Sequence, residues 1–264
     1  MIMYVEPACD SSLSAPPSAR WHDVLPQSIV REAASRQPAT RCSTCSLRVV
    51  CMPPDLTSSE LQQLDTVVLT TRNVHRGETL FRAHDAFQSL YAVRTGSFKT
   101  VVMHRDGREQ VTGFQIPGEP LGLDGVCSGT HNCDTIALED STVCIIPFGQ
   151  LETFCRESRR MQRHLYQLMS GEIVRESSLM MLLGTMTAEQ RLATFLLDLA
   201  ARFQARGYSG AQFNLKMSRE EIGCFLGMKL ETVSRMFSRF RRGGLVKPNG
   251  KQIRIVDLEG LAGV

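Results

Sequence analysis

The C-terminal third of the chain carries the local signals that most constrain its fold. Ser218 and Glu221 stand three residues apart at the start of an apolar run, the pattern of a capping box that begins a helix. Gly227 supplies a turn, and a second helical pattern then extends over residues 230–242. Asn249-Gly250, between two apolar segments, is typical of a two-residue β-hairpin. Helix, turn, helix and hairpin in this order predict a winged helix-turn-helix.

Charge separates this segment from the rest of the chain. Residues 185–264 contain 13 lysines and arginines against 7 aspartates and glutamates, whereas the other residues contain 17 against 20. The C-terminal segment is therefore strongly basic, although the whole chain has a net charge of only +3. A basic domain of this kind suits the phosphate backbone of a nucleic acid. We expect residues 185–264 to form a DNA-binding domain.

The helical pattern over residues 230–242 presents a candidate reading face. Glu231, Ser234 and Arg235 share one face near its N-terminus, the part of a recognition helix that enters the major groove. Arginine can pair with guanine, and glutamate can accept from cytosine. The alternative is a solvated face of an ordinary helix, but the capping box, turn glycine and hairpin around it favour DNA binding. The basic residues that suit phosphate contacts are Lys229, Arg239, Arg241, Arg242, Lys247 and Lys251.

Residues 56–150 show a different residue pattern, in which short apolar runs alternate with turns that contain glycine and aspartate. Runs such as Leu90–Val93 and Thr100–Met103 are typical of strands. Many short strands at near-regular spacing indicate an antiparallel barrel or roll. A capping signal at Thr57 predicts a short helix in front of them. We therefore expect an α+β protein whose residues 56–150 form an antiparallel β-roll, the sensor domain.

A helical segment with few breakers follows over about residues 148–183, and residues 151–184 are expected to be a dimerisation helix. Apolar residues recur along it in steps of three and four, as in a heptad seam. A second stripe of leucines lies beside this seam. One stripe could pack on the roll and the other on a second copy of the chain; a single wide stripe facing the chain's own core is the alternative. The predicted dimer seam is Tyr166, Met169, Ile173, Glu176, Met180 and Leu183.

The N-terminal part contains a tight cluster of thiols. Residues 1–40 are rich in Ser, Pro and Ala and lack periodicity, so we expect a disordered tail. Residues 41–55 hold Cys42, Cys45 and Cys51, whose sulfur atoms can reach one inorganic centre. Closed thiolate sites for zinc or an iron–sulfur cluster use four ligands, so a fourth thiol is required from elsewhere.

Composition argues against several other classes of protein. No run of about 18 apolar residues occurs, so we expect no membrane-spanning segment. The N-terminus lacks the pattern of a secretory signal, and nine cysteines without a scaffold-like spacing suit a reducing cytoplasm. The sequence contains no phosphate-binding glycine loop, paired metal-binding histidines or nucleophile motif, so an enzyme is not expected.

Together these features resemble the CRP/FNR superfamily of bacterial transcription regulators, in which a β-roll, a long helix and a winged helix-turn-helix follow one another. The resemblance covers residues 41–258 and is most specific to FNR, the oxygen-responsive branch. It rests on the spacing of the three N-terminal thiols and on three motifs, LYAVRTGS at residues 90–97, LMSGEI at residues 168–173 and ETVSR at residues 231–235. Lys229 departs from the family, which often has threonine at that position.

The resemblance to FNR implies a cofactor and partners. Cys144 would be the fourth ligand of a [4Fe–4S] cluster, with Cys133 as its chief rival. The intact cluster would favour a homodimer that reads a palindromic TTGAT-type site through the three reading residues named above. Like charges at Glu176 of the two copies would keep the dimer marginal, so cluster loss would release monomers. RNA polymerase would be a further partner, with the turn at residues 104–107 as the candidate contact.

Other signals are alternatives to oxygen. The cyclic-nucleotide branch shares the architecture, but it binds the cyclic phosphate and ribose through an arginine and a glutamate. Leu123 stands where that glutamate would lie, and residues 133–135 (Cys-Asp-Thr) replace the Arg-Ser-Ala motif, so we expect no cyclic nucleotide. Zinc, thiol oxidation or nitric oxide could act at the thiols instead. A single Cys-x-x-Cys pair favours a cluster over zinc, which usually takes two such pairs.

Overall fold

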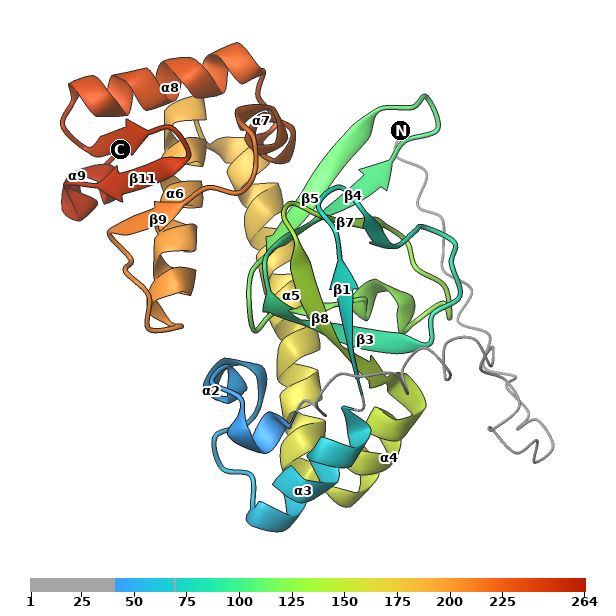
Figure 1. Ribbon diagram of the computed structural model, residues 1–264. Coiled ribbons are helices and arrows are strands. Elements are labelled where there is room, and N and C mark those ends of the chain that lie inside the picture. Colours follow the sequence, from blue (N-terminus) through green and yellow to red (C-terminus); the bar gives the residue numbers. More distant parts are fainter. Residues whose placement is uncertain (1–40, 69) are drawn as a thin grey trace.

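The computed structural model describes residues 41–68 and 70–264, and the predicted tail over residues 1–40 lies outside this part. The described chain starts with η2 (Cys42–Thr44), α2 (Arg48–Cys51) and α3 (Ser58–Val67). The helix α3 begins as predicted, because Thr57 and Glu60 form a reciprocal capping box around its first turn. These three elements lie together at one end of the molecule (Figure 1).

The predicted roll is present as two antiparallel four-stranded sheets. Its strands are β1 (Thr70–Val74), β2 (Thr79–Phe81), β3 (Ser89–Thr95), β4 (Phe98–Met103), β5 (Glu109–Gln115), β6 (Pro120–Leu121), β7 (Asp134–Ala137) and β8 (Ser141–Pro147). The strand order is β1-β8-β3-β6 in one sheet and β2-β7-β4-β5 in the other. Within the first sheet, Cys144 of β8 pairs with Thr71 on one side and Ala92 on the other. Val93 and Val143 are fully buried in the core of the roll.

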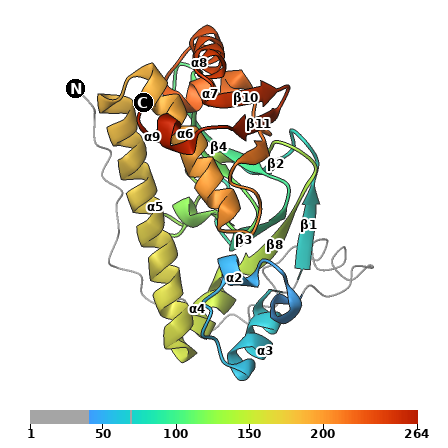
Figure 2. The ribbon, with the colours of Figure 1, turned by 90° about the vertical axis from the view of Figure 1, so that its left-hand side faces the viewer.

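The predicted long helix is divided in two at Ser158. The helices α4 (Phe148–Glu157) and α5 (Arg159–Thr185) meet at this residue, whose backbone is extended (φ −115°, ψ 107°). Its hydroxyl accepts a hydrogen bond from the Met161 amide and donates one of 2.6 Å to the Glu60 carboxylate on α3. This tertiary partner holds the break, which has no glycine or proline to mark it in the sequence. Beyond it, α5 runs along the whole molecule (Figure 2).

The C-terminal part is the winged helix-turn-helix that its sequence predicts. Its elements are α6 (Ala188–Gln204), β9 (Gln212–Asn214), α7 (Arg219–Leu226), α8 (Leu230–Arg242), β10 (Val246–Asn249), β11 (Gln252–Ile255) and α9 (Leu258–Ala262). The capping box of Ser218 and Glu221 starts α7, and Gly227 ends it in the left-handed conformation (φ +62°) that favours glycine.

The wing differs from the prediction in two details. Asn249 pairs with Gln252, so the two-residue turn is Gly250-Lys251, one position later than expected. Gly250 (φ +60°) then occupies the first turn position, where a type II′ turn takes glycine. In addition, β9 pairs with β11 and makes the wing a three-stranded sheet.

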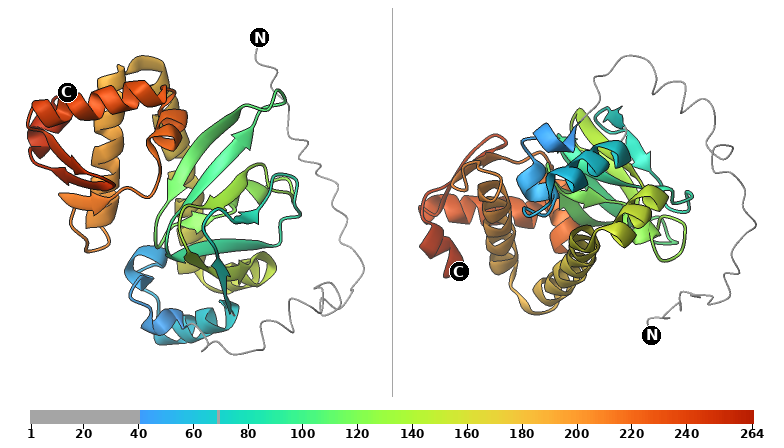
Figure 3. Two further views of the ribbon diagram at one scale, coloured as in Figure 1. Left: turned by 45° about the horizontal axis from the view of Figure 1, so that its top comes forward. Right: turned by 90° about the horizontal axis from the view of Figure 1, so that it is seen from below.

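One apolar core joins the roll to the C-terminal part. Val101, Val111 and Phe114 of β4 and β5 belong to the same buried cluster as the core of the helix-turn-helix. The Phe114 ring lies 5.3 Å from that of Phe225 on α7, and Figure 3 shows the C-terminal part beside the green strands of the roll. In residues 41–68 and 70–264 no helix combines the length and apolar character needed to cross a membrane.

Candidate thiolate site and nucleic-acid interface

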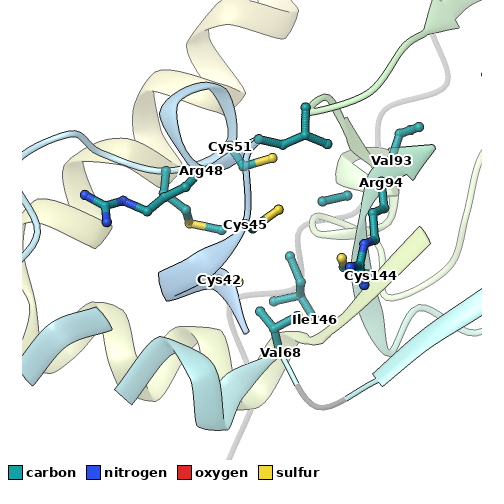
Figure 4. Close-up of a pocket in the computed structure, with 12 residues that line it drawn as sticks. Cys42, Cys45, Arg48, Cys51, Val68, Val93, Arg94, Cys144 and Ile146 are labelled. Carbon is teal, nitrogen blue, oxygen red and sulfur yellow. The ribbon is translucent and has the colours of Figure 1, made fainter. Parts of the chain in front are cut away.

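The four cysteines predicted as ligands line one pocket between the N-terminal loop and the roll. Cys42 begins η2, Cys45 follows it, and Cys51 ends α2, whereas Cys144 lies in the middle of β8. Figure 4 shows the sulfur atoms of Cys45 and Cys51 directed into the space from the loop side, with Cys144 on the opposite wall. The fold therefore brings the separated thiols of the sequence to one place. The other lining residues are Leu47, Arg48, Met52, Val68, Ala92, Val93, Arg94 and Ile146.

Three contacts hold the thiol loop, residues 42–51, against its surroundings. Ser43 donates hydrogen bonds to the Asp65 carboxylate of α3 from its amide (3.1 Å) and its hydroxyl (2.6 Å). His164 of α5 donates from Nε2 to the carbonyl oxygen of Cys51 at 2.8 Å. The Cys51 thiol donates to the carbonyl oxygen of Gly118 in the roll at 3.6 Å. The loop thus touches α3, α5 and the roll, and none of these contacts had a sequence signal.

The surroundings of the thiols oppose their ionisation when they stand alone. Burial, together with Cys144 and Asp65, raises the pKa of Cys42 to about 12. Burial together with Cys45 and Cys144 raises the pKa of Cys51 to about 12, and burial also raises the pKa of Cys144. Four thiolates in one small space would repel one another, so a positively charged core is needed to stabilise them together.

The donor set consists of four cysteine thiols, which suit an inorganic centre with thiolate ligands. Four cysteine thiolates are the usual ligands of an iron–sulfur cluster. One zinc ion would need its sulfur ligands about 2.3 Å from a common point. In the described ranges, no three Cys, His, Asp or Glu side chains converge closely enough to hold one metal ion. Both kinds of centre use thiolate ligands, so the chemistry of the four cysteines fits either one.

Cys133, the rival for the fourth position, lies elsewhere. Its thiol donates to the Asp124 carboxylate at 3.4 Å, and its side chain is buried in the core of the roll. Side chains of a strand alternate between its two faces, so Cys144 points away from Val143, which is in that core, and toward the loop. Of the two candidates, Cys144 is the one that lines the pocket.

The predicted reading face lies on the outer side of α8. Glu231 and Arg235 are exposed, and Ser234 is half-buried. Lys229 is the residue before the helix and makes no side-chain cap, so its ammonium group is exposed at the same end. The opposite side of α8 is anchored in the core by Val233, Phe237 and Phe240.

Two arginines of this surface have partners that sequence reasoning missed. Arg219, the first residue of α7, donates from Nη1 to the Ser234 hydroxyl at 3.2 Å and lies over the Phe237 ring, 5.1 Å from its centroid. It therefore links the two helices at the reading face. Arg239 pairs with Glu189 of α6 at 2.9 Å but keeps 63% of its side chain exposed. Each of these contacts joins two different helices, so the residue pattern within α8 alone could not indicate it.

The two stripes of α5 face different ways. Of the predicted seam, Tyr166, Ile173 and Met180 are 60–68% exposed, and Met169 and Glu176 are also exposed. Leu183 differs, because it is half-buried and packs against the core of the C-terminal part. The leucine stripe packs on the chain itself, through Leu165, Leu168, Leu179 and Leu182. An apolar stripe is thus left uncovered in the single chain, as a dimer seam requires.

The segment that carries the nucleotide-binding residues in the cyclic-nucleotide branch is occupied by the chain's own contacts. Asp124 accepts a hydrogen bond from the Asn132 amide at 2.7 Å and pairs with His131 Nδ1 at 3.3 Å. The His131 ring is buried and stacks on Phe81, with 3.7 Å between centroids. Cys133 stands where an arginine would meet the phosphate. The carboxylate of its neighbour Asp134 accepts from the Ala83 amide at 2.8 Å. The His131 ring and the carboxylates of this segment are thus engaged with one another, with Phe81 and with the backbone.

Comparisons with known proteins agree with this architecture. The cyclic nucleotide-binding domain family matches residues 71–158, and the Crp-like helix-turn-helix domain family matches residues 190–264. The chain is 44% identical over 223 residues to the transcriptional regulatory protein btr of Bordetella pertussis, covering 84% of this chain and 92% of that protein. It is 44% identical to the transcriptional activator protein anr of Pseudomonas aeruginosa, with 83% and 90% covered. It is 39% identical to the fumarate and nitrate reduction regulatory protein of Salmonella typhimurium, with 89% and 94% covered.

Among solved structures, FixK2 from Bradyrhizobium japonicum superposes with a TM-score of 0.68 at 31% identity, covering 74% of this chain and 96% of that one. Fold, matching families and relatives define a DNA-binding transcription regulator rather than an enzyme. The chain belongs to the CRP/FNR family, and regulators of the FNR, Anr and Btr type are its relatives over most of its length.

Proposed function

We propose that this regulator senses oxygen in the cytoplasm through a [4Fe–4S] cluster and binds DNA as a dimer when the cluster is intact. The observation that carries the proposal is the meeting of Cys42, Cys45, Cys51 and Cys144 at one pocket, from two distant parts of the chain. The FNR-type motifs and the relatives named above support the same reading.

The four thiols would hold the cluster, and the cluster would supply an iron–sulfur core that oxygen can oxidise. The chain itself would provide a largely apolar wall on the roll side and a short loop on the other. Because the loop is anchored on α3, α5 and the roll, a change in which thiols are engaged would alter its restraint on α5. The exposed stripe of α5 would then pair, or fail to pair, with a second copy.

Dimerisation matters because operator half-sites are spaced to match two recognition helices. Glu231, Ser234 and Arg235 would read bases of a palindromic TTGAT-type site, and Lys229 and Arg239 would meet phosphates. The turn at residues 104–107, at the tip of the β4–β5 hairpin, is exposed and would contact RNA polymerase.

Direct sensing by free thiols is the weaker alternative. The thiolate is the reactive form of cysteine, and a raised pKa keeps a thiol protonated at neutral pH. Burial raises the pKa of Cys42 and Cys51 to about 12, so these thiols would react slowly without a metal.

The test is to purify the full chain without oxygen and measure iron, acid-labile sulfide and visible absorbance. We expect about four irons and four sulfides per chain, and loss of the absorbance and of specific DNA binding in air. Cys144→Ser should lose the cluster, whereas the matched control Cys133→Ser should keep it. A colourless, iron-free protein that binds DNA equally well before and after exposure to air would overturn the proposal. Cluster loss in Cys133→Ser alone would overturn the assignment of the fourth ligand.

A further inference from the structure

One turn of the roll, residues 117–119, contacts the thiol loop directly. Gly118 has φ +91° and lies against the loop, because a Cβ at this position would be 3.0 Å from Val50 Cγ1 and 3.7 Å from Cys51 Sγ. Its carbonyl oxygen accepts a hydrogen bond from the Cys51 thiol when that thiol is protonated, whereas the contact with Val50 does not depend on this proton. The left-handed backbone and the close approach both require glycine here. The turn and the loop are therefore in close contact at Val50, beside a cavity that Cys51 and Gly118 both line.

The next residue, Glu119, reaches in the opposite direction, to the C-terminal part. Its buried carboxylate, 8% exposed, accepts from Arg202 Nε at 2.9 Å, Arg202 Nη2 at 2.5 Å and Arg206 Nη2 at 2.7 Å. The Ile116 amide donates to the same carboxylate at 3.0 Å. Both arginines also donate to backbone carbonyl oxygens of the roll, at Phe114 and Pro117.

This cluster is unlike the surface ion pairs of the chain. Two guanidinium groups in fixed geometry surround one buried carboxylate, so the angle between roll and α6 is specified as well as stabilised. Burial raises the pKa of Glu119, but the two arginines outweigh burial and hold that pKa below its usual range. The carboxylate is therefore ionised at neutral pH and pairs with both cations.

We propose that residues 117–119 are a junction that couples the position of the thiol loop to the orientation of the DNA-binding part, with Glu119 as the positioning residue. Gly118 and Glu119 are consecutive, so a shift of the turn against Cys51 also moves the carboxylate against the two arginines. This path does not use the dimer seam of α5. Its value for sensing rests on the proposed function, whereas the mechanical coupling is a property of the chain and can be tested alone.

Coupling between two sites is reciprocal, so it can be measured from either side. Hydrogen exchange of the full chain, purified without oxygen, would be followed in Glu119→Gln and in Asp65→Ala, which removes both acceptors of the far anchor of the loop. We expect Glu119→Gln to speed exchange at the Cys51 and Met52 amides about tenfold, in addition to the end of α6 around Ala205. We expect Asp65→Ala to speed exchange at the end of α6. Peptides that contain Val143 report global unfolding and should stay unchanged.

A matched control removes the charge of another carboxylate that pairs with Arg202 but lies on α6 itself. Asp198 pairs with Arg202 at 3.1 Å from one turn away on α6 and is 57% exposed. Asp198→Asn should leave the thiol loop unchanged, and an equal effect of this variant would overturn the junction. Faster exchange confined to α6 in Glu119→Gln would overturn it as well, because Glu119 would then be a local clamp. If Glu119→Gln does not fold, Arg206→Lys keeps the charge but loses the planar geometry, and it should loosen the same two segments.

A DNA-binding experiment separates this inference from the proposed function. With a palindromic duplex, the ratio of affinities before and after exposure to air should fall severalfold in Glu119→Gln relative to the unaltered chain. If exposure to air lowers the DNA affinity of the unaltered chain and of Glu119→Gln by the same factor, the junction is refuted and oxygen sensing is not. An unaltered chain without any response would refute the proposed function, while the exchange measurements would still decide the junction.

Discussion

Glu60 shows how one side chain can join three segments of this molecule. Its carboxylate caps α3 by accepting from the Thr57 amide at 2.8 Å, and it accepts from the Ser158 hydroxyl at the break between α4 and α5. Arg160, at the start of α5, lies 3.4 Å away. The hydrogen bond from Ser158, followed by that from Thr57, lowers the pKa of Glu60 to about 2.

Glu60→Gln should therefore destabilise the chain in a pH-dependent way. The pKa of the Glu60 carboxyl is about 2 in the folded chain, against an ordinary value of 4.5 that applies when the chain is unfolded. The ionised carboxylate therefore stabilises the fold above about pH 4.5, and this stabilisation is lost as the pH falls toward 2. At pH 7 we expect a loss of about 1 kcal/mol, as for other helix caps. Urea unfolding at pH 7 and pH 3 checks this, with exposed Glu152→Gln as the control. An equal loss at both pH values would contradict the assignment.

Arg235 and Arg242 are both exposed on α8 but should act differently on DNA. Arg235→Ala should cost about 1–3 kcal/mol on the preferred site and relax its sequence preference, because a bidentate contact to a base is lost. Arg242→Ala should weaken all sequences equally and reduce the slope of affinity against salt by about 1, because a phosphate contact is lost. Fluorescence anisotropy with matched and mutated duplexes at several salt concentrations distinguishes them. Identical profiles for both variants would remove Arg235 from the reading face.

At the scale of elements, α5 offers a sharp test of the dimer seam. Ile173 and Val174 are neighbours with nearly equal exposure, 65% and 62%, but only Ile173 lies on the predicted seam. Ile173→Asp should abolish the dimer of the protein purified without oxygen, because it buries an uncompensated charge. Val174→Asp, the matched control, should leave the dimer largely intact. Sedimentation velocity measures both, and the reverse order of effects would move the seam to the adjacent face.

Elements with a local chemical signal were predictable from the sequence. The capping boxes at Thr57 and Ser218, the left-handed Gly227 and the amphipathic pattern of α8 each act within a few residues, and the structure has all of them. The break at Ser158 was missed because Glu60 holds it from 98 positions away. The turn at Gly250 is shifted by one residue because the pairing of β10 with β11 decides which residues are free.

The candidate sites were predictable to different depths. Three of the thiols are close in sequence, but their meeting with Cys144 depends on the register of β8, which no local pattern contains. The same limit hid His164, Asp65 and the partners of Glu119, since each acts on a residue far away in the chain. The roles of the ligand, reading and seam residues stay predictions until the experiments above are done.

At the scale of the whole molecule, the continuous core between the roll and the C-terminal part sets cooperativity. Phe225 of α7 packs against Phe114 of the roll and against Phe195 of α6. Phe225→Ala should cost up to about 3 kcal/mol and divide one thermal transition into two, because it weakens the contact between the parts. Phe203→Ala, which disturbs stacking on Phe213 within the C-terminal part, should lower the melting temperature without dividing the transition. Calorimetry would reject the idea if Phe225→Ala also melts in one step.

The placement of Cys144 on β8 also sets an order of maturation. Three thiols leave the ribosome early, on a segment that precedes every strand of the roll. The fourth arrives with the last strand, which must insert between β1 and β3 before its thiol can face the loop. A nascent chain therefore displays an incomplete set of sulfur atoms, and only a closed roll completes it. A group that needs all four thiols would therefore bind only after the roll has folded.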